Sequence, residues 1–211
     1  MDGRGTAKHL TIGVLALQGD FREHMEVLDH LGIAAVPVRL PADLARCDAL
    51  IIPGGESTTI SLLLRTSGVG PLLSERIAGD MPVMGTCAGM IVLAKEVLDG
   101  RDDQGSYGAI DISVRRNAFG RQRDSFEADL EIVGLQDTGA AECRVRAVFI
   151  RAPIVERTGP SVQILASVDI AGEVKPVVCS EGAVLVTSFH PELVGEARLH
   201  KLFLHTIAAH R

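Results

Sequence analysis

Cys87 has sequence surroundings that favour a nucleophile. It lies in Gly-Thr-Cys-Ala-Gly, residues 85–89, after a short apolar run and before a stretch with helical spacing. A strand, a tight turn and a helix form a nucleophile elbow, and glycines two positions before and after the nucleophile give the backbone room to turn. Amide groups in the first turn of the helix would favour a thiolate. Taken alone, the motif is also compatible with a buried, unreactive cysteine.

His190 and Glu192 are the candidate base and orienting carboxylate for such a thiol. The other six histidines lie near the N-terminus or in predicted helices: His9, His24, His30, His200, His205 and His210. His190 follows a predicted strand, and Pro191 restricts it to extended conformations, which would place Glu192 on the same side. We therefore expect a triad of Cys87, His190 and Glu192. An isolated His-Pro-Glu is more often a surface histidine before a proline turn with a solvated acid, and no metal is expected because two donors would need further ligands.

The elements that must position these residues read as alternating strands and helices in the first half of the chain. Residues 10–17 are nearly all apolar, which is typical of a strand buried on both faces of a parallel sheet. Helical spacing begins at Phe21. Further strands are expected at residues 33–38, 49–52 and near 83–84, and a helix over residues 88–98. This alternation predicts a doubly wound sheet.

A Gly-Gly turn at residues 54–55 ends the third predicted strand. Ser57 or Thr58 is the expected cap of the helix that follows. Open α/β sheets bind ligands at the carboxyl ends of their strands. We therefore expect the free backbone N–H groups of this turn to lie near Cys87.

The second half of the chain changes character and predicts short strands. They are expected at residues 110–115, 128–133, 144–150, 162–168, 174–179 and 183–189, followed by a helix over 196–210. The pattern predicts a largely antiparallel extension of the sheet. The expected fold is thus a three-layer, flavodoxin-like α/β sandwich with a mostly parallel sheet. We expect a flexible extension at residues 1–9 and a single domain over 10–211.

Composition excludes several function classes. The formal net charge is −6 with no run of Lys or Arg, and the chain has no Trp and one Tyr, so neither nucleic acid nor an anionic membrane is an expected partner. No segment reads as a signal peptide or membrane span. The four cysteines lack a Cys-x-x-Cys pair, which predicts reduced thiols in a cytoplasmic protein. No cofactor is expected.

Two motifs resemble the signatures of class I, triad-type glutamine amidotransferases. They are Gly-Thr-Cys-Ala-Gly at 85–89 and Ser-Phe-His-Pro-Glu-Leu at 188–193. Further motifs resemble the glutaminase subunit of pyridoxal 5′-phosphate synthase. These are Leu-Gln-Gly at 17–19, Pro-Gly-Gly-Glu-Ser-Thr-Thr at 53–59, Arg-Asn-Ala-Phe-Gly-Arg-Gln at 116–122, Asp-Ser-Phe-Glu-Ala at 124–128 and Phe-Ile-Arg-Ala-Pro at 149–153. The resemblance spans the chain from Leu10.

The resemblance implies hydrolysis of L-glutamine to glutamate and ammonia. The ammonia would pass to a separate synthase subunit in a hetero-oligomer that makes the vitamin B6 coenzyme. The implied oxyanion donors are the backbone N–H groups of Gly55 and Ala88. The implied substrate site consists of Gly55, Glu56, Ser57, Arg116, Ile150 and Arg151. A guanidinium suits the α-carboxylate of glutamine, and Glu56 suits its ammonium.

Two other functions stay open at this point. A thiol hydrolase of the same fold would use the same three residues on another amide or ester, and a non-catalytic regulatory module would keep the scaffold alone. For the glutaminase, we expect weak activity in the isolated subunit. Our hypothesis is that the Gly54-Gly55 peptide becomes an oxyanion donor only when the partner docks.

Overall fold

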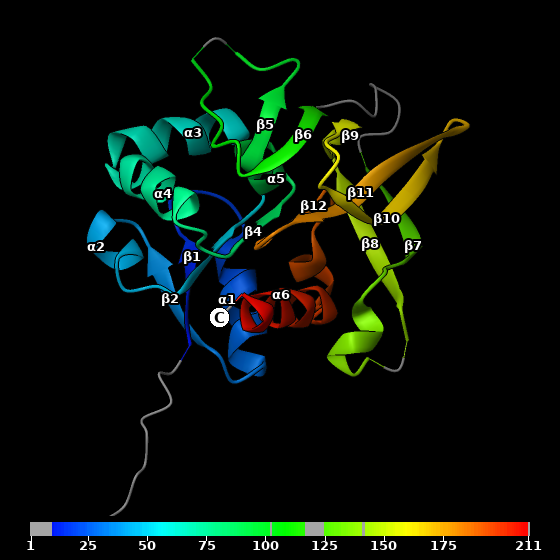
Figure 1. Cartoon of the computed structure of the whole chain (residues 1–211), viewed down its shortest axis with the longest axis horizontal. Helices are drawn as coiled ribbons and strands as arrows, with labels where there is room; N and C mark the ends of the chain where they lie inside the picture. The colour runs from blue at the N-terminus through cyan, green and yellow to red at the C-terminus, as the bar shows by residue number, and fades with distance from the viewer. Residues whose placement is uncertain (1–9, 102, 117–124, 141, 211) are drawn as a thin grey trace, which may run out of the picture.

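A seven-stranded sheet forms the centre of the protein (Figure 1). The computed structural model describes residues 10–101, 103–116, 125–140 and 142–210. The strand order is β10-β11-β12-β4-β3-β1-β2. The strands are β1 (Thr11–Leu15), β2 (Ala34–Val38), β3 (Ala49–Ile52), β4 (Val83–Thr86), β10 (Gln163–Ile170), β11 (Glu173–Glu181) and β12 (Val184–Thr187). From β12 to β2 all neighbours are parallel, whereas β10, β11 and β12 pair antiparallel. The predicted fold class is confirmed.

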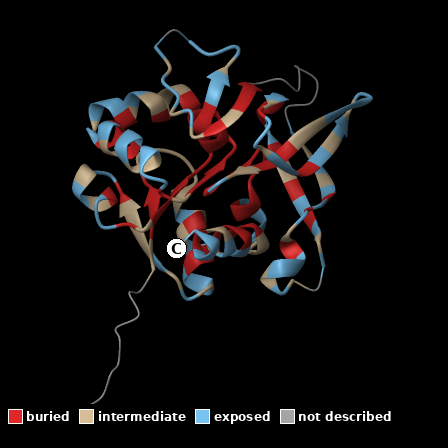
Figure 2. Ribbon diagram, in the orientation of Figure 1, coloured by how far each residue is buried: buried red, intermediate tan, exposed pale blue. Residues whose placement is uncertain are grey.

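Alternating side chains of the buried strands feed two separate cores. In β3, Leu50 and Ile52 belong to one apolar cluster, whereas Ala49 and Ile51 belong to the other. This period of two follows from the pleat, and both faces are apolar because helices cover both. The strands at the centre of the sheet are accordingly buried throughout (Figure 2).

Helices form the two outer layers. Apolar residues of one group of helices join the first cluster: α2 (Pro41–Leu44), α3 (Ser57–Thr66), α4 (Val69–Ala78) and α5 (Ala88–Leu93). On the opposite face lie α1 (Phe21–His30) and α6 (Arg198–Ala209), whose Leu28 and Phe203 belong to the second cluster. The arrangement is the expected three-layer sandwich. Among the described residues, no helix is long and apolar enough to span a membrane.

Only some strands of the expected antiparallel extension belong to the central sheet. Strands β10 and β11 extend it, but two smaller sheets are separate. One contains β5 (Ala94–Val97), β6 (Ile110–Arg115) and β9 (Ile154–Thr158); the other pairs β7 (Ser125–Glu131) with β8 (Arg144–Ile150). The first packs on the α3–α5 side and the second on the α1 and α6 side, because their apolar residues join the corresponding clusters.

Several element boundaries differ from the sequence prediction. The helix expected over residues 88–98 ends at Leu93, because Ala94 turns to an extended ψ of 151° and begins β5, which pairs with β6. Strand β9, helix α2 and helix α4 have no counterpart in the prediction. Two short 3-10 helices, η1 (Leu135–Thr138) and η2 (Pro191–Val194), also occur. The predicted extension at residues 1–9 lies outside the described part of the chain.

Candidate active site

Cys87 occupies the turn between β4 and α5. Its φ of 48° and ψ of −105° are unusual for a residue with a side chain. Its N–H donates to the carbonyl oxygen of Thr187 at 2.8 Å, which ties the turn to β12. Cys87 is 6% exposed, and its Sγ lies 3.9 Å from the carbonyl oxygen of Ile150. A strained backbone held in this way is typical of a functional turn, and the expected nucleophile elbow is present.

Close backbone approach explains the glycines around Cys87. A Cβ on Gly85 would lie 2.7 Å from the backbone of Gly89, and a Cβ on Gly89 would collide with the carbonyl oxygen of Ile52. Any larger residue would push α5 away from β3 and β4. The two glycines therefore let the helix begin directly on the sheet.

His190 reaches Cys87 because their strands are neighbours. Strands β4 and β12 run parallel, with Thr86 opposite Thr187, so both residues lie beyond the same sheet edge. The His190 side chain lies close enough to Cys87 for the thiol to raise the pKa of the imidazole, and its backbone N–H donates to the carbonyl oxygen of Val148 at 3.2 Å. A Cβ on Gly54 would collide with the His190 ring, so the Gly-Gly turn lies directly against the base.

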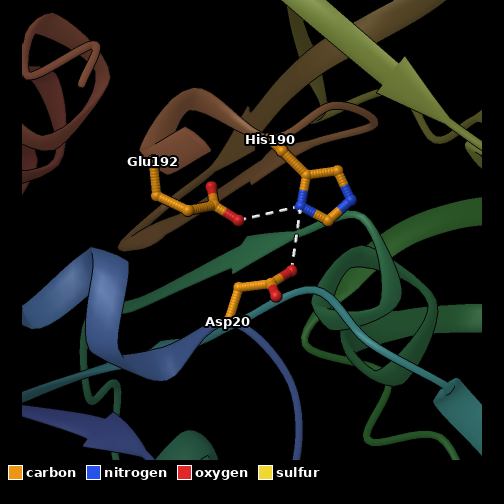
Figure 3. Close-up of side chains that lie close together, drawn as sticks. All are labelled: Asp20, His190 and Glu192. Carbon is orange, nitrogen blue, oxygen red and sulfur yellow. Dashed lines mark hydrogen bonds and ion pairs between the residues drawn. The ribbon is translucent and has the colours of Figure 1, made fainter. Parts of the chain in front are cut away.

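Glu192 lies behind His190, away from the thiol. Its Oε1 accepts from His190 Nδ1 at 2.8 Å (Figure 3). The sequence argument for this pairing assumed extended backbone, and that part was wrong: Glu192 lies in η2, the 3-10 helix that begins at Pro191. The tight turn, rather than an extended strand, brings the carboxylate back to the ring. Both side chains are nearly inaccessible to solvent.

Electrostatics favour a charged His190. Burial alone would lower the pKa of His190, but its interactions with Cys87 and Glu192 outweigh it and raise the pKa to about 10. Burial also raises the pKa of Glu192, although the bond from His190 opposes that rise. The arrangement therefore stabilises an imidazolium beside the thiol. A hydrolase with a cysteine nucleophile requires such a base.

Asp20 adds a second carboxylate near the base. Its Oδ2 lies 3.5 Å from His190 Nδ1, the same ring nitrogen that Glu192 contacts (Figure 3). Asp20, His190 and Glu192 offer ligand atoms within 4.8 Å of one another, a spacing that would suit a metal ion. However, the short contact to Glu192 is a hydrogen bond that needs a proton on Nδ1, so we interpret the group as part of the triad.

A cavity of about 620 Å³ opens in front of Cys87 and His190. Its lining includes all the predicted oxyanion and substrate residues: Gly55, Glu56, Ser57, Ala88, Arg116, Ile150 and Arg151. They come from the ends of β3, β4, β6 and β8, so the fold brings together positions that are far apart in the sequence. Glu192 alone of the predicted residues does not line the cavity, because it is buried behind the base.

The charged wall of the cavity is organised around Glu56. This residue, and not Ser57 or Thr58, is the N-cap of α3: its carboxylate accepts from the backbone N–H groups of Thr58 and Thr59. Burial would raise the pKa of Glu56, but the bonds from the two threonines lower it to about 2. Arg116 Nη2 lies 3.1 Å from Glu56 Oε1. The cavity thus holds an ion pair beside the open space.

Sequence reasoning missed several residues at the site. Gln18, Asp20, Ile91 and Leu193 line the cavity, and Gln104 accepts from Arg116 Nη1 at 2.8 Å. Gln18 Oε1 accepts from the N–H of Glu56 at 2.9 Å. Gln18 and Asp20 follow β1, whose carboxyl end shares the sheet edge with β3, and this position was the available signal. Residues 117–122 and 124 of the family-like motifs lie outside the described residues.

The fold and the site define a class I glutamine amidotransferase, and the comparisons identify its family. Residues 14–209 match the SNO glutamine amidotransferase family. The chain belongs to that family, as its motifs indicated. A curated relative from Acidothermus cellulolyticus is 53% identical over 94% of both chains, and one from Mycobacteroides abscessus is 52% identical over 94% of this chain and 97% of the relative. Both are named pyridoxal 5′-phosphate synthase subunit PdxT.

Solved structures agree with this placement. The crystal structure of a glutamine amidotransferase superposes with a TM-score of 0.83 at 46% identity, covering 93% of this chain and 98% of that chain. A glutamine amidotransferase from Thermotoga maritima has a TM-score of 0.61 at 11% identity, covering 94% of this chain and 98% of that one. The second likeness supports the fold alone.

Proposed function

We propose that the protein hydrolyses L-glutamine to L-glutamate and ammonia through a thioester on Cys87. The observation that carries the proposal is the buried Cys87–His190–Glu192 arrangement facing a cavity at the sheet edge. Membership of an amidotransferase family supports glutamine as the substrate. We assign the activity to a single domain over residues 10–211 that needs no cofactor.

The reaction divides into acylation and deacylation. Cys87 Sγ attacks the side-chain carboxamide carbon as a thiolate while His190 holds the proton. As the C–N bond breaks, His190 gives that proton to the leaving nitrogen, and ammonia departs. His190 then takes a proton from water as its oxygen attacks the thioester carbon. The C–S bond breaks, glutamate leaves and loses its carboxyl proton to solvent, and the thiolate and the protonated His190 are restored as a pair. Glu192 keeps the imidazole oriented and stabilises its positive charge.

The Gly54-Gly55 turn and the start of α5 are the proposed oxyanion hole. The backbone N–H groups of Gly55 and Ala88 would donate to the oxygen that becomes negative in each tetrahedral intermediate. One such donor contributes about 3 kcal/mol to the transition state of acyl transfer. Both residues line the cavity beside Cys87, which supports the assignment.

The charged wall of the cavity, around Glu56 and Arg116, is the proposed binding site for the α-amino and α-carboxyl groups of glutamine. Arg116 and Arg151 are the candidate partners of the α-carboxylate, because a guanidinium forms paired hydrogen bonds with it. Glu56 is the candidate partner of the ammonium. It keeps its negative charge well below neutral pH, and its side chain is 49% exposed despite capping α3. Ser57 and Ile150 complete the lining.

The proposed partner is a pyridoxal 5′-phosphate synthase subunit in a cytoplasmic hetero-oligomer. The support is the identity of the relatives, which are named as subunits of that synthase. Ammonia is mostly protonated in neutral water and then cannot act as a nucleophile, so a glutaminase gains from firing only when docked. Asp20 N–H donates to the carbonyl oxygen of Gly54 at 3.3 Å, a contact that docking could rearrange to aim the Gly55 N–H.

Ammonia release from glutamine tests the proposal. The chain mixed with a synthase subunit from a relative should release ammonia and glutamate in equal amounts, faster than the chain alone. The Cys87→Ala variant, which keeps the fold, should release none. Activity on other amides but not on glutamine would favour a different thiol hydrolase, and no activity with a bound partner would favour a regulatory module. Equal rates with and without the partner would remove the activation hypothesis.

A further inference from the structure

The second carboxylate oxygen of Glu192 faces an enclosed pair of histidines that the mechanism above does not use. Oε1 is satisfied by His190, but Oε2 accepts no hydrogen bond from any described residue. Its neighbour is Nε2 of His24, at 3.4 Å, on helix α1. His24 is 0% exposed. An ionised carboxylate oxygen buried without a donor is strongly destabilising, so this contact calls for a physical account.

His24 is itself held from behind by His200 on helix α6. His24 Nδ1 lies 2.9 Å from His200 Nε2, and His24 Nε2 lies 3.1 Å from Thr86 Oγ1, directly before Cys87. His200 is also 0% exposed, and its Nδ1 has no hydrogen-bond partner among the described residues. Burial lowers the pKa of His24 well below its usual value and that of His200 to about 4, so both rings are neutral near pH 7.

Two arrangements of the ring protons are consistent with these contacts. In the first, His24 carries its proton on Nε2, between Thr86 Oγ1 at 3.1 Å and Glu192 Oε2 at 3.4 Å, and His200 carries its own on Nε2 toward His24. This gives Glu192 Oε2 a long contact with a donor and leaves the neutral lone pair of His200 Nδ1 unpaired. In the second, both protons lie on Nδ1, which in His200 is near the backbone of Glu196 but forms no hydrogen bond of ordinary geometry with it. The lone pair of His24 Nε2 then accepts from the hydroxyl of Thr86 and also lies against Glu192 Oε2. The first arrangement is favoured because an unpaired carboxylate oxygen is the more costly defect.

We propose that His24 is a positioning residue for the triad, with its Nε2–H shared between Thr86 Oγ1 and Glu192 Oε2 and its tautomer fixed by His200. The inference rests on the proposed function, since it concerns the orienting group of that site. His24 keeps Glu192 ionised and aimed at His190 without touching the substrate. Side chains that bind catalytic metals are commonly oriented in this way by a hydrogen-bond partner behind them. In this protein, the contacts from His200 to His24 and from His24 to Glu192 connect α6 and α1 to the active edge of the sheet.

The tautomer can be measured directly on the full chain. In protein with ¹⁵N-labelled histidine, long-range ¹H–¹⁵N correlation spectra distinguish a protonated Nε2 from a protonated Nδ1. We expect both His24 and His200 to be protonated at Nε2 near pH 7, with the signals assigned by their loss in His24→Gln and His200→Gln. A protonated Nδ1 on His24 would overturn the proposal. This measurement needs neither glutamine nor the partner.

A matched pair of variants tests the functional consequence. Gln places an amide N–H near the position of His24 Nε2, whereas Met has similar length and no donor. With the partner subunit present, His24→Met should lower kcat about 10- to 100-fold, by analogy with the loss of a hydrogen-bond partner that orients a metal ligand. His24→Gln should retain most of the rate. Equal loss in both variants, or full activity in both, would contradict the proposal.

Alkylation of Cys87 provides a readout that does not depend on the substrate. The titratable groups that face His190 and Glu192 are Cys87, Asp20 and His24; behind them His200 faces His24, and Glu196 faces His200. Iodoacetamide labelling, followed by mass spectrometry of the Cys87 peptide, reports the thiolate–imidazolium pair as a function of pH. In His24→Met, the labelling rate should fall and its profile should shift, whereas His24→Gln should match wild type. Identical profiles in all three proteins would overturn the inference, even if glutamine proved not to be the substrate.

Discussion

At the scale of the residue, the site combines buried histidines whose pKa values move in opposite directions. His190 is held as a cation by a thiol and a carboxylate, because those contacts outweigh the penalty of burial. His24 and His200 lie behind Glu192, and there burial is the largest influence on both rings and keeps them uncharged near pH 7. The same side chain thus acts as a base at the cavity and as a neutral hydrogen-bonding group behind it.

This contrast predicts a pH dependence of stability on the acid side. The pKa of His200 is about 4 in the folded chain, against an ordinary value of 6.5 when unfolded. Between these values the unfolded chain binds a proton that the native chain does not. The free energy of unfolding therefore rises with pH from about 4 to about 6.5, by about 3 kcal/mol in full, at ~1.4 kcal/mol per pKa unit. His190 has the opposite sign, and its contribution is complete below pH 6.5.

Urea unfolding of His200→Gln across this pH range checks the prediction. Gln does not titrate and can still donate to His24, so the slope between pH 4 and 6.5 should become shallower. His205→Gln is the control, because His205 is exposed on the same helix and should leave the slope unchanged. Parallel curves for wild type and His200→Gln would show that burial does not depress this pKa.

At the scale of the element, the turns at the strand ends set the geometry of the site. The Gly-Gly turn after β3 packs against the ring of His190, and the elbow after β4 packs against β3. Neither turn leaves room for a Cβ at its closest point. The base, the nucleophile and the proposed oxyanion donors are therefore fixed by backbone contacts, rather than by side-chain packing alone.

Gly54→Ala tests this role of the turn. The added methyl group collides with His190, and the ring must move to accommodate it. We expect glutaminase activity to fall about 100-fold, the effect of displacing a reacting group by an ångström, and the free energy of unfolding to fall by about 1–3 kcal/mol from overpacking.

Gly32→Ala is the control for this test. Gly32 has a φ of 69° and nothing within 4 Å of the position of a Cβ, so it should lose about 1 kcal/mol to backbone strain and keep its activity. If Gly54→Ala retained wild-type turnover, the proposed fit between turn and base would be wrong.

At the scale of the whole molecule, the sequence predicted the sheet and its active edge because both depend on local signals. Buried parallel strands are apolar throughout, and glycine turns and His-Pro mark their ends. The elements that the sequence prediction assigned wrongly or missed depend on contacts between distant parts of the chain. Residues 94–97 continue a helix-like pattern, but pairing with β6 makes them a strand. Helix α4 begins among Gly68, Gly70 and Pro71, which read as a loop although proline is tolerated in a first turn.

The role of His24 illustrates the same limit. It lies in a helix that the sequence predicted well, and nothing in the spacing of α1 shows what lies opposite. Helices α1 and α6 pack on the face of the sheet opposite α5. Only this packing brings His24 to Glu192 and His200. Tertiary contacts between elements distant in the chain therefore supply the part of the site behind the triad.

Trapping the acyl-enzyme tests the central claim most directly. The chain and a synthase subunit would be mixed rapidly with glutamine, quenched in acid and analysed by intact mass and peptide mapping. We predict a transient mass increase of one glutamyl acyl group on the peptide containing Cys87, rising before steady ammonia release and absent from Cys87→Ala. Steady ammonia release with Cys87 unmodified at every quench time, together with an active Cys87→Ala variant, would contradict the account.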